Sequence, residues 1–197
     1  MKDIIKRMID RYGTSSIQYA VITFGNVPIT RISFDTAFLG DEALKSLIDS
    51  VRKSSGALLN RALAGAKNFF ETQGRPNAKK VLVVITDKKS SSSLSNVANE
   101  AKILEEDDIK VIPVALGSES DISELSTTTP NKENLVDVDE GDDPDVTAEI
   151  ILLKILKGNL VCNNCRRLVH TWYPHCVSCC LDFPVWNPRD MLFSRPK

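Results

Sequence analysis

The strongest hydrophobic pattern in the chain is an unbroken apolar run between Lys80 and Thr86. Its five residues, Val81 to Ile85, include four β-branched side chains, and Asp87 follows directly after Thr86. A short run that is apolar on both faces predicts a strand buried in the middle of a parallel sheet. Open α/β sheets bind ligands at the carboxyl ends of such strands, so Asp87 is the first candidate site residue.

The remaining pattern predicts strands and helices in a defined order. Ile109–Leu116 is a second continuous apolar strand, and Leu135–Val138 is a weaker one. Two β-rich runs are separated by Gly25-Asn26, which predicts a hairpin formed by Ile17–Phe24 and Val27–Phe34. Apolar residues at helical spacing predict helices at Ile4–Tyr12, Asp41–Lys53, Leu58–Glu71, Leu94–Glu105 and Val146–Leu156, with a short helical turn at Asp121–Ser126.

This order of elements indicates the fold class. Strands that alternate with helices after the hairpin predict an α/β domain in three layers, with a mainly parallel open sheet and helices on both faces. The hairpin would add one antiparallel edge strand. We place this domain at residues 1–157. Residues 158–197 show no clear periodicity and contain all five cysteines, which predicts a small, separate cysteine-rich tail.

Composition excludes several classes of protein. The apolar fraction of 42% and the charged fraction of 26% are typical of a soluble globular protein, and the net charge of −1 favours neither nucleic acid nor a membrane surface as partner. No apolar run approaches the roughly 20 residues that span a bilayer, so we expect no membrane insertion. The first ten residues lack the apolar core of a signal peptide.

Four segments together resemble the von Willebrand factor type A domain: Tyr19–Gly25, Gly56–Leu63, Gly74–Asp87 and Ile109–Gly117. The resemblance covers about residues 2–157 and is closest to matrix-type members, such as those of matrilins and collagens. It implies a Rossmann-like open sheet, non-enzymatic adhesion to a protein ligand, and an extracellular setting.

The resemblance also implies a divalent-cation site built from three loops. In the family these supply an Asp-x-Ser-x-Ser sequence after the first strand, a Thr from a Gly-rich loop, and an Asp after a later strand. Asp87 matches the last of these, Ala57 falls where the Thr would be, and Lys88 replaces a common Gly. A methyl group cannot bind a metal, and an ammonium repels one.

The chain begins in what resembles the helix after the first loop, so this strand and its ligands are absent. We therefore expect an incomplete adhesion site without Mg²⁺, in which Asp87 is a residual position, and a chain that is part of a longer product or a larger assembly.

The cysteines of the tail have the spacing of a small zinc ribbon. Cys162 and Cys165 form one Cys-x-x-Cys pair, and Cys176 and Cys179 form the other. Four thiolates suit tetrahedral Zn²⁺. Three interpretations stay open: structural zinc, disulfides mixed with free thiols, and a tail without function. None is catalytic, because zinc held by four thiolates has no open position for a substrate.

Two polar segments receive structural interpretations. Ser90–Ser93 is interpreted as a flexible linker. Glu119–Glu149 contains eleven acidic residues and one lysine, which predicts a solvated rim, and the acidic residues of Asp142–Asp145 are expected to cap the final helix.

The sequence thus predicts a protein–protein interaction module whose partner is a matrix or adhesion protein. The alternative is an intracellular, cytoplasmic scaffold of the same fold, with a zinc-ribbon tail that acts in complex assembly. An enzyme is not expected, since the chain has neither a Gly-rich phosphate loop nor a paired nucleophile and base.

Overall fold

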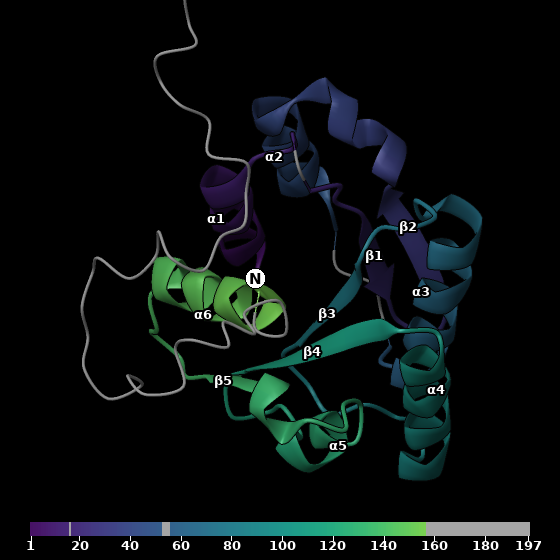
Figure 1. Ribbon diagram of the computed structural model, residues 1–197. Helices are drawn as coiled ribbons and strands as arrows, with labels where there is room; N and C mark the ends of the chain where they lie inside the picture. The colour runs from purple at the N-terminus through teal and green to yellow at the C-terminus, as the bar shows by residue number, and fades with distance from the viewer. Residues whose placement is uncertain (16, 53–55, 157–197) are drawn as a thin grey trace, which may run out of the picture. The chain divides into compact units, whose positions relative to one another are not determined.

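The computed structural model describes residues 1–15, 17–52 and 56–156 (Figure 1). The predicted zinc ligands lie outside the described residues, as does the whole of the predicted tail. The zinc site and the division of the chain between residues 157 and 158 therefore stay predictions. Met1–Ile155 form one compact unit. Its helices are α1 (Lys2–Tyr12), α2 (Asp41–Ser50), α3 (Leu59–Gln73), α4 (Leu94–Glu106), α5 (Ile122–Ser126) and α6 (Pro144–Leu156), with 3₁₀ turns η1 (Phe34–Leu39) and η2 (Lys132–Asn134). Its strands are β1 (Val21–Phe24), β2 (Pro28–Ile32), β3 (Lys80–Thr86), β4 (Ile109–Leu116) and β5 (Val136–Val138).

Three strands form a parallel sheet with β4 in the centre. β3 pairs with β4 from Lys80↔Ile109 to Thr86↔Ala115, and β4 pairs with β5 from Val114↔Val136. β4 buries six of its eight residues, because it has a strand on each side and helices on both faces. The predicted α/β fold class is confirmed.

The position of β3 corrects one prediction. The apolar run Val81–Ile85 was expected in the middle of the sheet, but among the described residues β3 pairs with β4 alone. Only Val84 of its seven residues is buried. The reason is that no described strand pairs with the other edge of β3, so no neighbouring strand covers this edge.

The hairpin forms a second sheet instead of an edge of the first. β1 and β2 are antiparallel, with Phe24 opposite Pro28, and in the described part of the chain they share no ladder with β3. The predicted strand from Val27 to Phe34 ends at Ile32, and η1 follows.

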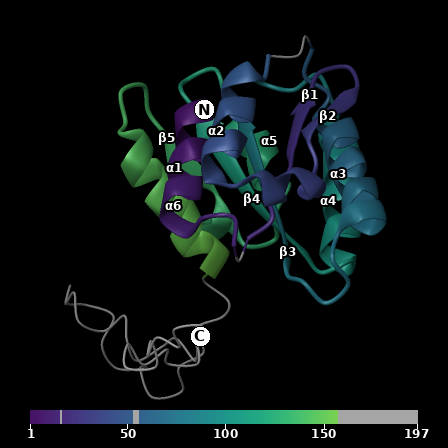
Figure 2. The same cartoon turned by 90° about the horizontal axis from the view of Figure 1, so that it is seen from above.

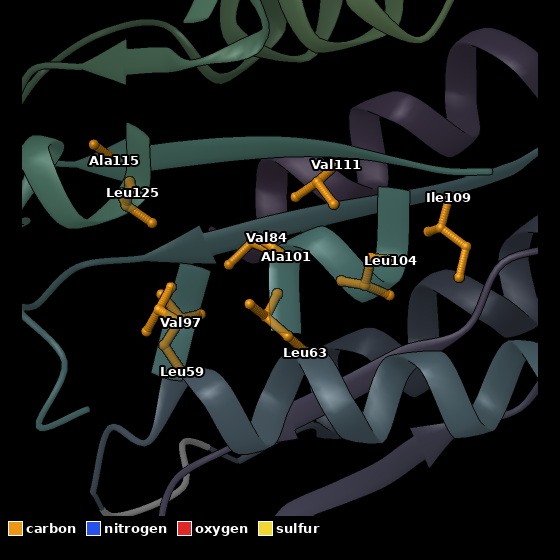
Figure 3. Close-up of a cluster of buried hydrophobic side chains, with 10 residues drawn as sticks. All are labelled: Leu59, Leu63, Val84, Val97, Ala101, Leu104, Ile109, Val111, Ala115 and Leu125. Carbon is orange, nitrogen blue, oxygen red and sulfur yellow. The ribbon is translucent and has the colours of Figure 1, made fainter. Parts of the chain in front are cut away.

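Helices cover both faces of the parallel sheet (Figure 2). On one face, α3 and α4 pack against β3 and β4. Figure 3 shows this cluster, with the side chains of Leu63 and Leu104 directed towards Val84 and Val111. On the other face, α1 and α6 pack against the same strands through Ile4, Met8, Ala148, Ile151 and Leu152.

Helix α1 also contacts the hairpin. Its residues Ile4 and Met8 belong to the cluster over the parallel sheet, whereas Ile9 packs with Ile32 of β2 and with Leu44 of α2. On the opposite side, α3 contacts β1 and β2. The two sheets are therefore held together by helices that contact both. Among the helices of the described residues, none is long and apolar enough to cross a membrane.

Candidate binding face at the carboxyl end of the sheet

Three loops meet at the carboxyl ends of β1 and β3. Leu58 N–H, just before α3, donates to Gly25 O after β1 at 3.0 Å. Ser91 N–H, in the loop after β3, donates to Ala57 O at 2.7 Å. The structure thus brings the loop of Ala57 to the loop that contains Asp87 and Lys88, as the sequence predicted. We call these three loops, together with the loop after β4, the carboxyl-end face.

The backbone just after β3 is fixed by the hydroxyl of Thr86. This hydroxyl donates to Lys88 O at 2.9 Å and accepts from Lys88 N–H at 3.2 Å. The neighbouring Asp87 is half-buried, whereas the side chain of Lys88 is exposed. The face therefore presents an ammonium group to solvent beside the position where the family resemblance implies a cation.

The loop after β4 is tied to the end of β3 by Ser120. Its hydroxyl donates to Thr86 O at 2.9 Å and accepts from Leu116 N–H at 3.1 Å. Because β3 and β4 are parallel, their carboxyl ends lie at the same edge, and this serine joins the two loops that follow.

The serines after β3 cap a distant helix. The N-cap position of α3, Leu58, has no side chain that can accept. Ser90 Oγ accepts from Leu59 N–H and Ser92 Oγ accepts from Asn60 N–H, both at 3.2 Å. Ser92 Oγ also donates to Asn60 Oδ1 at 2.8 Å. The linker interpretation of Ser90–Ser93 was wrong, because these hydroxyls satisfy amides that the start of a helix leaves without intrahelical partners.

Glu124 of α5 is the one acidic residue of the span Glu119–Glu149 that is buried, with 3% of its surface exposed. Its Oε2 accepts from Ser90 N–H at 2.9 Å. The solvated rim predicted for this span is therefore interrupted at Glu124. A carboxylate taken out of water needs such donors, so this contact fixes α5 to the loop after β3.

An ion pair lies beside this contact. Lys89 Nζ is 2.8 Å from Asp121 Oδ2. The hydrogen bond from Lys89 and the one from Glu124 N–H lower the pKa of Asp121, and the bond to Asp121 raises the pKa of Lys89. Both side chains therefore stay ionised at neutral pH.

Several polar groups of this face have partners within the domain. Mg²⁺ requires oxygen ligands in octahedral geometry. At the position of Ala57 there is a methyl group, and Ser90 and Ser92 direct their hydroxyls to α3. Across residues 1–15, 17–52 and 56–156, no three His, Cys, Asp or Glu side chains are grouped so that they could hold a metal ion.

A separate groove of about 340 Å³ lies where α1, α2 and the start of α6 meet. Its walls are charged, and its cations are paired: Lys45 with Asp10 at 2.7 Å and Arg7 with Asp145 at 3.2 Å. At the same place Asp143 Oδ1 accepts from Asp145 N–H, so the predicted acidic cap of the last helix is present. The two ion pairs link α1 to α2 and α1 to α6. Each of the four paired side chains therefore has a partner of opposite charge.

A three-layer α/β domain with its loops converging at the carboxyl ends of parallel strands defines a Rossmann-like class of binding domain. The chain belongs to one family of this class, the von Willebrand factor type A domain, whose model matches residues 1–148. The resemblance seen in the sequence is therefore confirmed.

The relatives include matrix proteins. The chain is 27% identical over 122 residues to the collagen alpha-4(VI) chain of Mus musculus, which covers 60% of this chain and 5% of that protein. Proximal thread matrix protein 1 from the mussel byssus is similar in structure, with a TM-score of 0.69 and 21% identity, over 79% of this chain and 42% of its own. A second structure of that mussel protein, described with a zinc-occupied MIDAS motif, gives a TM-score of 0.65 and 22% identity, over 79% of this chain and 41% of its own. The chain thus spans less than half the length of these relatives, and it is a protein-interaction domain of the matrix type.

Proposed function

We propose that this domain is a non-enzymatic adhesion module which binds a matrix or adhesion protein through the carboxyl-end face, without a divalent cation. The observation that carries the proposal is the exposed side chain of Lys88, whose backbone N–H and C=O are both hydrogen-bonded to the hydroxyl of Thr86 at the end of β3. An acidic side chain of the partner can bind to the ammonium of Lys88 directly, where a cation would otherwise join two sets of oxygen atoms.

The internal contacts of the face support this proposal. The hydroxyls of Ser90 and Ser92 and the ammonium of Lys89 have partners within the domain. Because these groups are satisfied, binding needs no rearrangement of the loops. The matrix relatives support an extracellular setting.

The experiment compares binding with and without Mg²⁺. The full chain is passed over a panel of immobilised, purified matrix proteins in Mg²⁺ and then in EDTA, and the dissociation constant is measured by surface plasmon resonance. We expect equal affinity in the two buffers and a loss of about tenfold in Lys88→Glu, because the charge at the contact is reversed. Lys79→Glu is the matched control, since Lys79 is exposed just before the opposite end of β3. Binding that disappears in EDTA, or an equal loss in both variants, would contradict the proposal.

The second candidate function is a scaffold in complex assembly whose tail is a zinc ribbon. The spacing of Cys162, Cys165, Cys176 and Cys179 favours it. Metal analysis of the purified full chain, with thiols titrated before and after a chelator, tests this alternative. One Zn²⁺ per chain held by four thiolates supports the scaffold, whereas disulfides or freely reactive thiols without zinc exclude it.

A further inference from the structure

Helix α6 has apolar side chains on two opposite sides. One side packs against the parallel sheet and buries Ile151 and Leu152. The opposite side presents Val146, Ile150 and Leu153 to solvent, with 55%, 39% and 55% of their surfaces exposed. A helix at the surface of a domain ordinarily carries polar residues on the side away from the core. The outer side of α6 therefore resembles a surface that is covered by another layer.

The three exposed residues form one continuous stripe. Val146 and Ile150 are four positions apart, and Ile150 and Leu153 are three apart, which makes their side chains neighbours on the helix surface. We call these three residues the α6 stripe. Because the stripe faces away from the parallel sheet, a further strand in that sheet would not cover it.

Charged groups border the α6 stripe where α6 lies beside α1 (Figure 2). Glu149 Oε2 is 3.7 Å from Arg11 Nη2, and Asp145 Oδ1 is 3.2 Å from Arg7 Nε. An apolar patch with a polar rim is typical of protein–protein interfaces, whereas single exposed apolar residues are common on any surface. Ile103 is such a single residue: within α4, a fully described helix, no other large apolar residue is exposed one turn away from it.

The α6 stripe is nearly symmetric about Ile150. A twofold axis at Ile150 would place two α6 helices antiparallel, with Val146 against Leu153 of the partner subunit. Each residue of a twofold interface meets the same surface from the other side, so such an interface requires a patch that complements itself. The α6 stripe meets this requirement, because its two outer residues are both apolar and lie at similar distances from its centre.

The charges of α6 favour the same arrangement. Asp143 and Asp145 lie at the start of the helix, and Lys154 lies in its last turn. An antiparallel copy brings the acidic start of each helix near the basic end of the other, and it brings the positive end of each helix dipole near a negative end. A parallel copy would bring acidic ends together. A second copy of this chain thus matches the stripe in both shape and charge.

We propose that the α6 stripe is the interface of a twofold dimer of this chain, in which two α6 helices pack antiparallel and cross at Ile150. The dimer removes both stripes from water, which is the main source of its stability. The interface does not include Lys88 and does not depend on the proposed function.

The first test is sedimentation velocity of the full chain from about 1 to 300 μM, a range that covers dissociation constants typical of weak dimers. A reducing buffer prevents disulfides between chains. We expect a reversible dimer that depends on concentration. Ile150→Glu should raise its dissociation constant at least tenfold, because two carboxylates then face each other at the centre of the interface. Ile103→Glu is the matched control, since Ile103 is exposed to a similar extent, 37%, and it should dimerise like the unmodified chain.

The second test examines the antiparallel arrangement. Val146→Lys and Leu153→Glu should each weaken the dimer. A mixture of the two variants should associate about tenfold more tightly than either alone, because the introduced charges attract each other in one half of the interface while Val146 and Leu153 stay in contact in the other half.

Three results overturn the proposal: a full chain that stays monomeric over the whole range, equal weakening by Ile150→Glu and Ile103→Glu, or a mixture no tighter than its separate variants. A monomeric chain would indicate that another segment or another protein covers the α6 stripe. Far-UV circular dichroism of each variant verifies that it is folded. Lys88→Glu should leave dimerisation unchanged, so failure of the dimer is distinguishable from failure of the carboxyl-end face.

Discussion

Ser90 and Glu124 are joined by a hydrogen bond of 2.9 Å, from the backbone N–H of the serine to a carboxylate that is almost fully buried. The two residues are 34 positions apart, and their contact ties the loop after β3 to α5. The contact positions the serines that cap α3, because Ser92 N–H in turn donates to Ser90 Oγ at 2.9 Å.

Removal of the Glu124 carboxylate should destabilise the domain. Glu124→Ala leaves the half-buried Ser90 N–H without its acceptor, and we expect the free energy of unfolding to fall by about 1–3 kcal/mol. Glu124→Gln retains an acceptor oxygen and should lose less than half of this. Urea denaturation measures both, with Glu119→Ala at an exposed position as the control. Equal losses in the Gln and Ala variants would show that the charge matters more than the acceptor.

The serine cap of α3 should contribute measurably to stability. Ser92→Ala removes the acceptor for Asn60 N–H, and we expect a loss of about 1 kcal/mol in the free energy of unfolding. Ser91→Ala is the matched control, because Ser91 is exposed in the same loop and contacts Ala57 through its backbone N–H. Thermal and urea unfolding of the two variants give the comparison. A loss as large in Ser91→Ala would refute the capping role of Ser92.

Tyr19 should make stability depend on pH in the alkaline range. Burial, and secondarily the charge of Asp41, raise the pKa of Tyr19 from 10.0 to about 12. The folded protein therefore keeps the phenol protonated where the unfolded chain ionises. The contribution of Tyr19 to the free energy of unfolding is fully present below pH 10, and it is lost as the pH rises towards 12.

An absorbance titration that follows the ionisation of tyrosine should show that Tyr19 in the folded protein ionises at a higher pH than the ordinary pKa of 10.0. Tyr19→Phe should flatten the fall in stability over this range. Tyr12→Phe should change it less, because Tyr12 is exposed and is the smallest of the three causes that raise the pKa of Tyr19. The assignment fails if Tyr12→Phe has the larger effect.

Mg²⁺ should not stabilise the domain. A ligand that binds the folded state alone raises the melting temperature in a saturable way, and we expect no such rise up to millimolar MgCl₂. NaCl of equal ionic strength is the control for general salt effects. A saturable rise specific to Mg²⁺ would show that Asp87 has oxygen ligands beside it which suit a cation.

The apolar patterns predicted most of the fold because they are local. The runs at Val81–Ile85 and Ile109–Leu116 were sufficient to place two parallel strands, and the helical spacing placed the six helices within a few residues of their ends. The separation of the hairpin from the parallel sheet was not predicted. Strand pairing is a non-local property, and no pattern within Val21–Phe24 distinguishes a strand with one neighbour from a strand with two.

The site was predictable in part. The spacing to known motifs placed Ala57, Asp87 and Lys88 in neighbouring loops, and the structure brings these loops together. The buried carboxylate of Glu124 was not predicted, because nothing distinguishes it from the other acidic residues among the eleven of Glu119–Glu149. One signal was present: Asp121 and Glu124 have the spacing of a capping box, in which Asp121 accepts from Glu124 N–H. The side chain of Glu124 then serves the distant Ser90, which no local pattern reveals.

The eleven residues of α1 have a role beyond covering the sheet. Ile4 and Met8 belong to the apolar cluster over the parallel strands, and Ile9 belongs to the cluster of the hairpin. The helix therefore connects the hairpin to the parallel strands. Because Ile4, Met8 and Ile9 belong to one helix, loosening of one cluster also displaces the side chain or side chains that α1 contributes to the other. The hairpin and the sheet should therefore unfold as a single cooperative unit, even though they share no backbone hydrogen bond in the described part of the chain.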